Sequence, residues 1–116
     1  MTGKLVNRTR GLVLVSQCEM ATSLVARARG LLGHAPLKPG QGMLISPCQS
    51  IHTFFMSFPI DVAFLNREMR IVHIIPSMHP WRLSPHLFKA HSVLELPAGT
   101  LATTDSRVGD ELAFSA

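Results

Sequence analysis

The residues best suited to chemistry in this sequence are a cysteine, a histidine and two carboxylates. Cys48 and His52 are four residues apart, and a histidine close to a cysteine can act as the base that forms a nucleophilic thiolate. Asp61 and Glu95 each interrupt an apolar run, where an unpaired charge would be costly to bury. One hypothesis is therefore a hydrolytic or metal-dependent enzyme that uses Cys48, His52 and Asp61. The alternative is a half-buried thiol beside a histidine that bonds to the backbone, because free cysteine is often buried.

The two carboxylates allow a structural and a chemical interpretation. Asp61 could anchor the fold by accepting hydrogen bonds from Arg27, Thr53 or backbone N–H groups. It could instead bind a ligand or act as a general base. If Asp61 and Glu95 lie on one face of a sheet, they can form a paired-carboxylate site.

Potential metal ligands are numerous, but their spacing does not favour a metal site. The chain has six histidines and two cysteines. None of the histidines follows the HxH, HxxxH or HExxH patterns that bring two ligands onto one strand or helix face. We therefore predict no metal site, and the sequence identifies no cofactor.

Ligand binding without catalysis is the first hypothesis for function. Residues 48–65 contain four of the six phenylalanines, and Trp81 and Arg82 follow in a proline-rich loop. A large aromatic side chain in such a loop can plug the core or cap a pocket. We predict that a small or extended ligand binds in a groove lined by residues 48–65 and Trp81. The predicted ligand-binding residues are Met56, Asp61, Trp81, Arg82 and Glu95. The competing interpretation assigns the methionine and aromatic side chains to the hydrophobic core.

The charge distribution suggests a third hypothesis. Six basic residues and one acidic residue lie within residues 1–40, which gives this part a charge of +5, while the whole chain has +4. A basic face could dock on an acidic partner protein. The chain has no tyrosine and no run of lysine or arginine, so we find no specific signal for nucleic-acid binding. The sequence does not determine the oligomeric state.

Length and composition predict one domain, residues 1–116, in the cytoplasm. At 116 residues and 47% hydrophobic residues, the chain can bury a core of its own. Two cysteines do not make a disulfide framework. No stretch approaches the roughly 20 apolar residues that a membrane span needs.

Short elements joined by turns predict a mainly β fold. Eight prolines and eight glycines are spread along the chain, which favours short strands over long helices. Thr22 or Ser23 can cap one short helix near residues 22–33, with Gly33 at its end. A hairpin is predicted at residues 5–15, and the clearest hairpin at residues 60–75. The remaining predicted strands lie at residues 43–46, 50–56, 93–96 and 112–114. We expect a small antiparallel β-sandwich or barrel, jelly-roll-like.

Five motifs occur in an order that resembles a known family. They are RARGLLGH (27–34), GMLISPCQSIHTFFMSFPIDVAFL (42–65), PWR (80–82), VLELPAG (93–99) and GDELAF (109–114). The series is similar to the bacterial and archaeal family called domain of unknown function 192. The resemblance implies one compact, mainly β domain of jelly-roll-like type with a helix near its start, and it implies no activity. Phe55 departs from the family pattern, which often has glycine there, as in HTFGM; His34 and Asn66 also depart from it.

Overall fold

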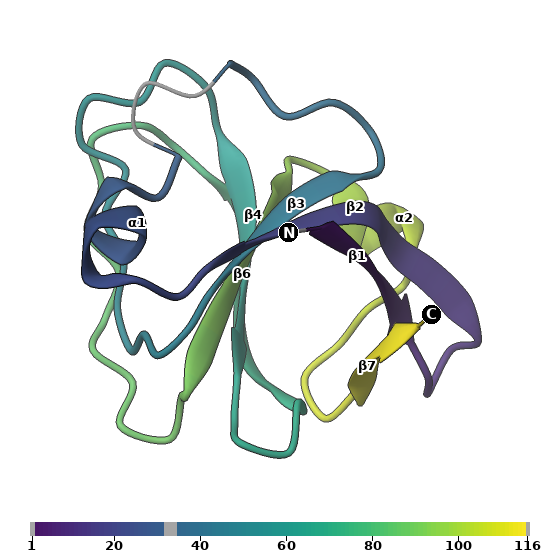
Figure 1. The fold of residues 1–116 in the computed structure, drawn as a ribbon. Helices are drawn as coiled ribbons and strands as arrows, with labels where there is room; N and C mark the ends of the chain where they lie inside the picture. Colours follow the sequence, from purple (N-terminus) through teal and green to yellow (C-terminus); the bar gives the residue numbers. More distant parts are fainter. Residues whose placement is uncertain (1, 32–34, 116) are drawn as a thin grey trace.

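The computed structural model describes residues 2–31 and 35–115 as one curled β-sheet with two short helices (Figure 1). In chain order the elements are β1 (Thr2–Asn7), β2 (Leu12–Ala21), α1 (Leu24–Arg29), β3 (Gln41–Ile45), β4 (Ile60–Leu65), β5 (Ile71–Met78), β6 (Ser92–Pro97), α2 (Thr100–Thr103) and β7 (Leu112–Ser115). The strands lie in the order β5-β4-β6-β3-β2-β1-β7. Neighbouring strands are antiparallel except for β2 and β3, which are parallel.

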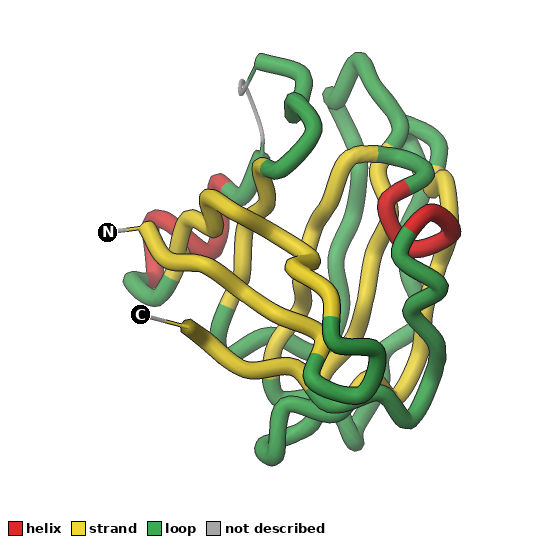
Figure 2. Tube along the Cα trace, turned by 90° about the vertical axis from the view of Figure 1, so that its right-hand side faces the viewer, coloured by secondary structure: helices red, strands yellow, loops and turns green. Residues whose placement is uncertain are grey.

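The curl brings the two edges of the sheet together at one end. The main chain joins the start of β5 to the start of β7, because the Leu112 N–H donates to the Met69 carbonyl at 2.8 Å and the Ile71 N–H donates to the Asp110 carbonyl at 2.9 Å. Edge strands normally present unpaired backbone groups, and this contact removes some of them. The result is a half-barrel. Figures 1 and 2 show α1 and α2 on opposite sides of its central strands.

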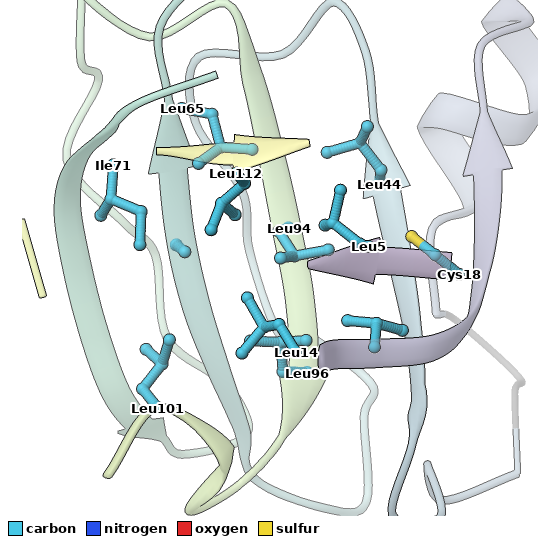
Figure 3. Packing of buried hydrophobic residues seen from close by; sticks show 12 residues of the cluster. Leu5, Leu14, Cys18, Leu44, Leu65, Ile71, Leu94, Leu96, Leu101 and Leu112 are labelled. Carbon is cyan, nitrogen blue, oxygen red and sulfur yellow. The ribbon is translucent and has the colours of Figure 1, made fainter. Parts of the chain in front are cut away.

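Each face of the sheet packs against its own hydrophobic core. Successive side chains of a strand point to opposite faces, so Ala63 and Leu65 of β4 belong to the cluster inside the curl. Figure 3 shows this cluster, with leucines from six strands and α2 converging on one another. Val62 and Phe64 belong to a second cluster on the outer face, toward α1. All six residues of β4 are therefore buried.

The mainly β prediction is confirmed, together with a short helix near the start of the chain. Both predicted hairpins form, as β1–β2 and β4–β5. The structure adds α2 and the parallel β2–β3 pair. Helix α1 is shorter than predicted because Gly30 takes a positive φ of 50° and ends it, while Gly33 lies outside the described residues.

The predicted strand at residues 50–56 is wrong. This segment is a loop, and its one ladder contact is an isolated bridge between His52 and Leu83. Isoleucine, threonine and phenylalanine favour strands, but Phe55 has a φ of 66°, which turns the chain out of an extended path. The backbone instead bonds to another loop, since the Thr53 N–H donates to the Arg82 carbonyl at 2.9 Å.

Within the described residues, the structure contains no helix long and apolar enough to cross a membrane.

Candidate functional site

Glu95 is a carboxylic acid placed on an apolar sheet face. On β6 it lies opposite Met43 of β3 and Val62 of β4, and its side chain faces the outer cluster. The residue is 3% exposed, and its Oε1 atom has no hydrogen-bond partner. Burial disfavours the charged form, which raises the pKa of Glu95 to about 7. The carboxyl group therefore holds its proton over most of the acidic range.

Helix α1 ends directly against Glu95. Ser23 caps the helix by accepting a hydrogen bond from the Ala26 N–H at 3.1 Å. After the last helical residue, the positive φ of Gly30 lets the chain turn. A Cβ atom built on Gly30 would lie 3.8 Å from Glu95 Oε1, in ordinary contact distance. The end of the helix is thus within reach of the carboxyl group.

Arg27 lies on the same helix and has a second unpartnered atom. Its Nη1 donates to the Pro47 carbonyl at 3.2 Å, which joins α1 to the loop after β3. Its Nε is buried without a hydrogen-bond partner. Among the described residues, the third buried side-chain atom of this kind is the Ser92 hydroxyl. Buried polar groups are normally paired, so such atoms call for an explanation.

Glu95 and Arg27 line one cavity, which we name the α1 pocket. Its volume is about 180 Å³. The cavity has an apolar side made by residues such as Leu31, Ile45 and Met56, and a polar side made by Arg27, Cys48, Ser50, His52 and Glu95. The site thus combines an apolar wall with two polar residues, each of which has a buried atom without a hydrogen-bond partner.

Cys48 and His52 both lie in the α1 pocket, but each has its own partner. Cys48 Sγ donates to the Ser50 carbonyl at 3.0 Å, and burial raises the pKa of the Cys48 thiol. His52 Nδ1 accepts a hydrogen bond from the Phe54 N–H at 3.2 Å. The His52 ring also stacks on the Phe54 ring with centroids 4.9 Å apart. A raised thiol pKa lowers the thiolate fraction on which nucleophilic chemistry depends.

Asp61 lies on the opposite face of the sheet from Glu95. In the register of β4 and β6, Val62 is the residue opposite Glu95, and neighbours along a strand point to opposite faces. Asp61 is 1% exposed and accepts three backbone N–H groups. The donors are Ser77 at 2.8 Å, Gly99 at 3.1 Å and Leu101 at 2.9 Å. The structure therefore brings Asp61 together neither with Glu95 nor with Cys48 and His52.

Trp81 belongs to a group of exposed rings that we name the aromatic ledge, made of His52, Phe54, Phe55 and Trp81. Trp81 is 56% exposed and Phe55 is 72% exposed, and their ring centroids are 4.6 Å apart. His52 and Phe54 also line the α1 pocket, so the ledge borders its mouth. Both Phe55 and Trp81 have positive φ, which costs about 1 kcal/mol per residue for side chains of this kind. Glycine adopts such a backbone conformation without this cost, which agrees with the glycine that the resemblance described above implies at position 55.

Buried Thr53 connects the two loops that form the ledge. Its carbonyl accepts the Trp81 N–H at 2.9 Å, and its hydroxyl accepts the Arg82 N–H at 2.9 Å. Arg82 itself is exposed. Of the predicted ligand-binding residues, Met56 and Glu95 line the α1 pocket, whereas Asp61, Trp81 and Arg82 do not.

A larger open groove adjoins the α1 pocket, and we name it the basic groove. Its volume is about 700 Å³. Arg27 and Cys48 line both cavities. Arg67 and Lys89 add two further cations, and Glu68 is the acidic residue of the groove among the residues described. Nothing in the local sequence around Arg67 or Lys89 distinguishes these two residues from solvated surface charges, so the sequence alone does not indicate them.

Comparison with known proteins places the chain in a family. The family model for domain of unknown function 192 (DUF192), described as Uncharacterized ACR, matches residues 5–114. The chain belongs to the DUF192 family. It is 31% identical over 114 residues to a UPF0127 protein of Pyrococcus horikoshii, covering 93% of this chain and 96% of that protein. A UPF0127 protein of Thermococcus gammatolerans is 32% identical over 117 residues, covering 95% of this chain and 74% of the other.

Two solved structures share the fold of this DUF192 protein. A protein of unknown function from Novosphingobium aromaticivorans matches with a TM-score of 0.83 and 22% identity, over 97% of this chain and 84% of that one. A protein named as a putative transcription regulator from Sinorhizobium meliloti matches with a TM-score of 0.80 and 23% identity, over 97% of this chain and 92% of that one. At these identities the likeness shows the fold alone.

Proposed function

We propose that this DUF192 protein binds a small polar molecule in the α1 pocket, with Glu95 and Arg27 as the principal contacts. The observation that carries the proposal is that Glu95 and Arg27 line one cavity, and that each has a buried polar atom without a hydrogen-bond partner, Oε1 of Glu95 and Nε of Arg27. A group without a partner lowers stability by about 1–3 kcal/mol, so a ligand that pairs both atoms would recover free energy on binding. Such a ligand donates a hydrogen bond to Glu95 and accepts one from Arg27.

The dimensions and surface of the pocket also support a small ligand. A volume of about 180 Å³ exceeds that of a single water molecule, which takes about 30 Å³ in the liquid. The apolar wall that includes Met56 can pack against a short carbon skeleton. The aromatic ledge at the mouth offers further apolar contact through Phe54. Met56 and Glu95 are the two predicted ligand-binding residues that this proposal keeps inside the pocket.

Binding is favoured over thiol catalysis by the partners of the two candidate residues. Cys48 and His52 share the pocket, but their hydrogen bonds go to Ser50 and Phe54 rather than to each other. A thiol nucleophile needs a base within hydrogen-bond reach and an orienting group for that base. The structure offers neither for Cys48 among the described residues.

A screen with matched variants tests the proposal. Free amino acids, hydroxy acids and short polyols are screened by saturation-transfer NMR against the full chain, because each carries a donor and an acceptor. Glu95→Leu removes the acceptor, and Ser92→Ala removes a buried unpartnered hydroxyl that does not line the pocket. We expect compounds that bind the wild type to lose at least about tenfold in affinity with Glu95→Leu.

The control variant Ser92→Ala should bind the same compounds as the wild type. The proposal fails if no compound of the panel binds. It also fails if Glu95→Leu binds every hit as tightly as the wild type does.

A further inference from the structure

We propose that the ligand of the α1 pocket carries a phosphate group, and that the basic groove binds this group through Arg27, Arg67 and Lys89. This inference rests on the proposed function, since it places one end of the ligand at Glu95 and the other end in the groove. The two cavities share Arg27 and Cys48 and therefore adjoin each other, which is the arrangement that a ligand spanning both requires.

One side-chain and two backbone hydrogen bonds bring the three cations to one groove from distant parts of the chain. Arg27 reaches the loop after β3 through the Pro47 carbonyl, and the next residue, Cys48, donates its N–H to the His91 carbonyl at 2.9 Å. The His91 N–H in turn donates to the Leu65 carbonyl at 2.7 Å, at the end of β4. Arg67 follows Leu65 by two residues, and Lys89 precedes His91 by two residues, so this bond holds both cations near the groove. The groove is therefore formed by connected main chain and not by independent surface loops.

The cations of the groove differ from other arginines of the chain in their partners. Arg8, Arg10, Arg70 and Arg107 form ion pairs with Asp105, Asp110 or Glu111. In the described structure, neither Arg67 nor Lys89 forms an ion pair with a carboxylate, although Glu68 lies in the same groove. Arg27 has a hydrogen bond to a carbonyl only through Nη1, and its Nε stays unpartnered. The positive charge of the groove is available to an anion.

The charge of the groove favours phosphate among anionic groups. The groove is lined by three cations, Arg27, Arg67 and Lys89, and by one carboxylate, Glu68. A phosphate monoester carries close to two negative charges at neutral pH and three acceptor oxygens, which several donors from different directions can bind together. Arginine and lysine are the residues that bind phosphate most often in this way.

The experiment compares phosphorylated molecules with their unphosphorylated counterparts. The wild-type chain is titrated with inorganic phosphate, with O-phosphoserine against serine, and with glycerol 3-phosphate against glycerol, and the backbone amides are followed by NMR. We expect each phosphorylated compound to bind at least about tenfold more tightly than its counterpart, with an affinity that falls as salt is added. Amide shifts should include Gln49, Asn66 and Lys89 of the groove.

Two variants localise the effect. The double variant R67Q/K89Q removes two cations of the groove and should abolish the preference for phosphate. The control Arg107→Gln removes one exposed arginine that pairs with Asp105 elsewhere on the surface, and it should keep the preference. Equal affinities within each pair of compounds would overturn the inference, and so would an equal loss in both variants.

The inference and the proposed function can fail separately. If unphosphorylated hits bind at Glu95 and phosphate has no effect, the inference fails and the proposed function stands. If phosphate binds the groove and Glu95→Leu changes no affinity, the link between the two cavities fails. A single-stranded oligonucleotide that binds far more tightly than every phosphate monoester would replace the small ligand by a nucleic acid, and it would overturn the inference as stated.

Discussion

Asp61 and Glu95 are buried carboxyl groups on neighbouring strands, and their surroundings are opposite. Asp61 points inside the curl toward α2 and accepts three backbone N–H groups from two segments of the chain. Glu95 points to the outer face toward α1, where its Oε1 atom has no partner. The carboxylate on the inner face anchors two segments of the chain, whereas the carboxyl group on the outer face keeps one oxygen without a hydrogen-bond partner.

The difference separates a carboxyl group that stabilises the fold from one that is available to a binding site. A carboxylate that accepts several N–H groups fixes the segments that donate them, and its removal leaves those donors unpaired. An unpartnered acid in a cavity lowers stability, and folded proteins tolerate such costs mainly at functional positions. Burial alone would have given both residues the same interpretation.

The largest expected effect comes from Asp61. Asp61→Ala leaves the N–H groups of Ser77, Gly99 and Leu101 without their acceptor inside the protein. We expect the free energy of unfolding to fall by about 3 kcal/mol, measured by urea denaturation. Glu68→Ala, at an exposed position in the β4–β5 turn, is the control and should change it by less than about 0.5 kcal/mol. A loss as small as that of the control would show that Asp61 is not an anchor.

The second prediction concerns the pH dependence of stability. The pKa of Glu95 is about 7 in the folded protein, against 4.5 for an unperturbed glutamate, which stands for the unfolded chain. Below the unfolded pKa, both states are protonated and burial costs little. Above pH 4.5 the unfolded chain releases this proton while the folded protein keeps it, so stability falls as the pH rises, until the folded pKa of about 7 has been passed. The loss amounts to about 3 kcal/mol between about pH 4.5 and pH 8.

Urea denaturation at several pH values measures this loss. Glu95→Gln has a side chain of the same shape that does not ionise, so the difference between wild type and variant should grow with pH over this window. A constant difference would mean that Glu95 is not the group responsible.

Burial acts to raise the pKa of Asp110, but hydrogen bonds from Asn7 and Arg10 outweigh it and lower that pKa. The stabilisation from Asp110 is therefore lost at the acidic end, as the pH falls through its folded pKa.

The smallest expected effect concerns the helix above Glu95. Ser23→Ala removes the hydroxyl that accepts the Ala26 N–H, and the loss of such a cap costs about 1 kcal/mol. Thr22→Ala changes the neighbouring exposed residue and is the matched control. Amide hydrogen exchange should become faster at Ala26 and Gly30 in Ser23→Ala alone, because α1 frays. Equal exchange in both variants would mean that the cap does not hold the end of α1 over the pocket.

The sequence predicted the frame of this fold better than its site. β4 was recognisable because the six residues from Ile60 to Leu65 are nearly all apolar and include no proline or glycine. Alternate residues of this run could therefore be assigned to opposite faces of a strand. The sequence did not reveal that Asp61 and Glu95 lie on opposite faces. That separation depends on the register between β4 and β6, which lie more than twenty-five residues apart in the chain. Local propensity misled at residues 50–56, where Phe55 adopts a turn conformation that its side chain disfavours.

The polar contacts of the pocket were predictable only in part. Glu95 stood out as an acid within the apolar run VLELP. Arg27 was named as a possible donor to Asp61. Its place in the pocket depends instead on its contact with Pro47, twenty residues later. A frequent family glycine at the position of Phe55 was the one signal that could have indicated the turn in advance.

The parallel pairing of β2 and β3 has a consequence for how the pocket could change over evolution. Two parallel strands that follow each other in the chain require a connection that returns along the sheet, and residues 22–40 make it here. This return segment includes α1 and therefore supplies Arg27 and Gly30. Glu95 comes from a separate strand. Substitutions in the return segment could thus alter what the protein recognises while the sheet and its inner core stay as they are.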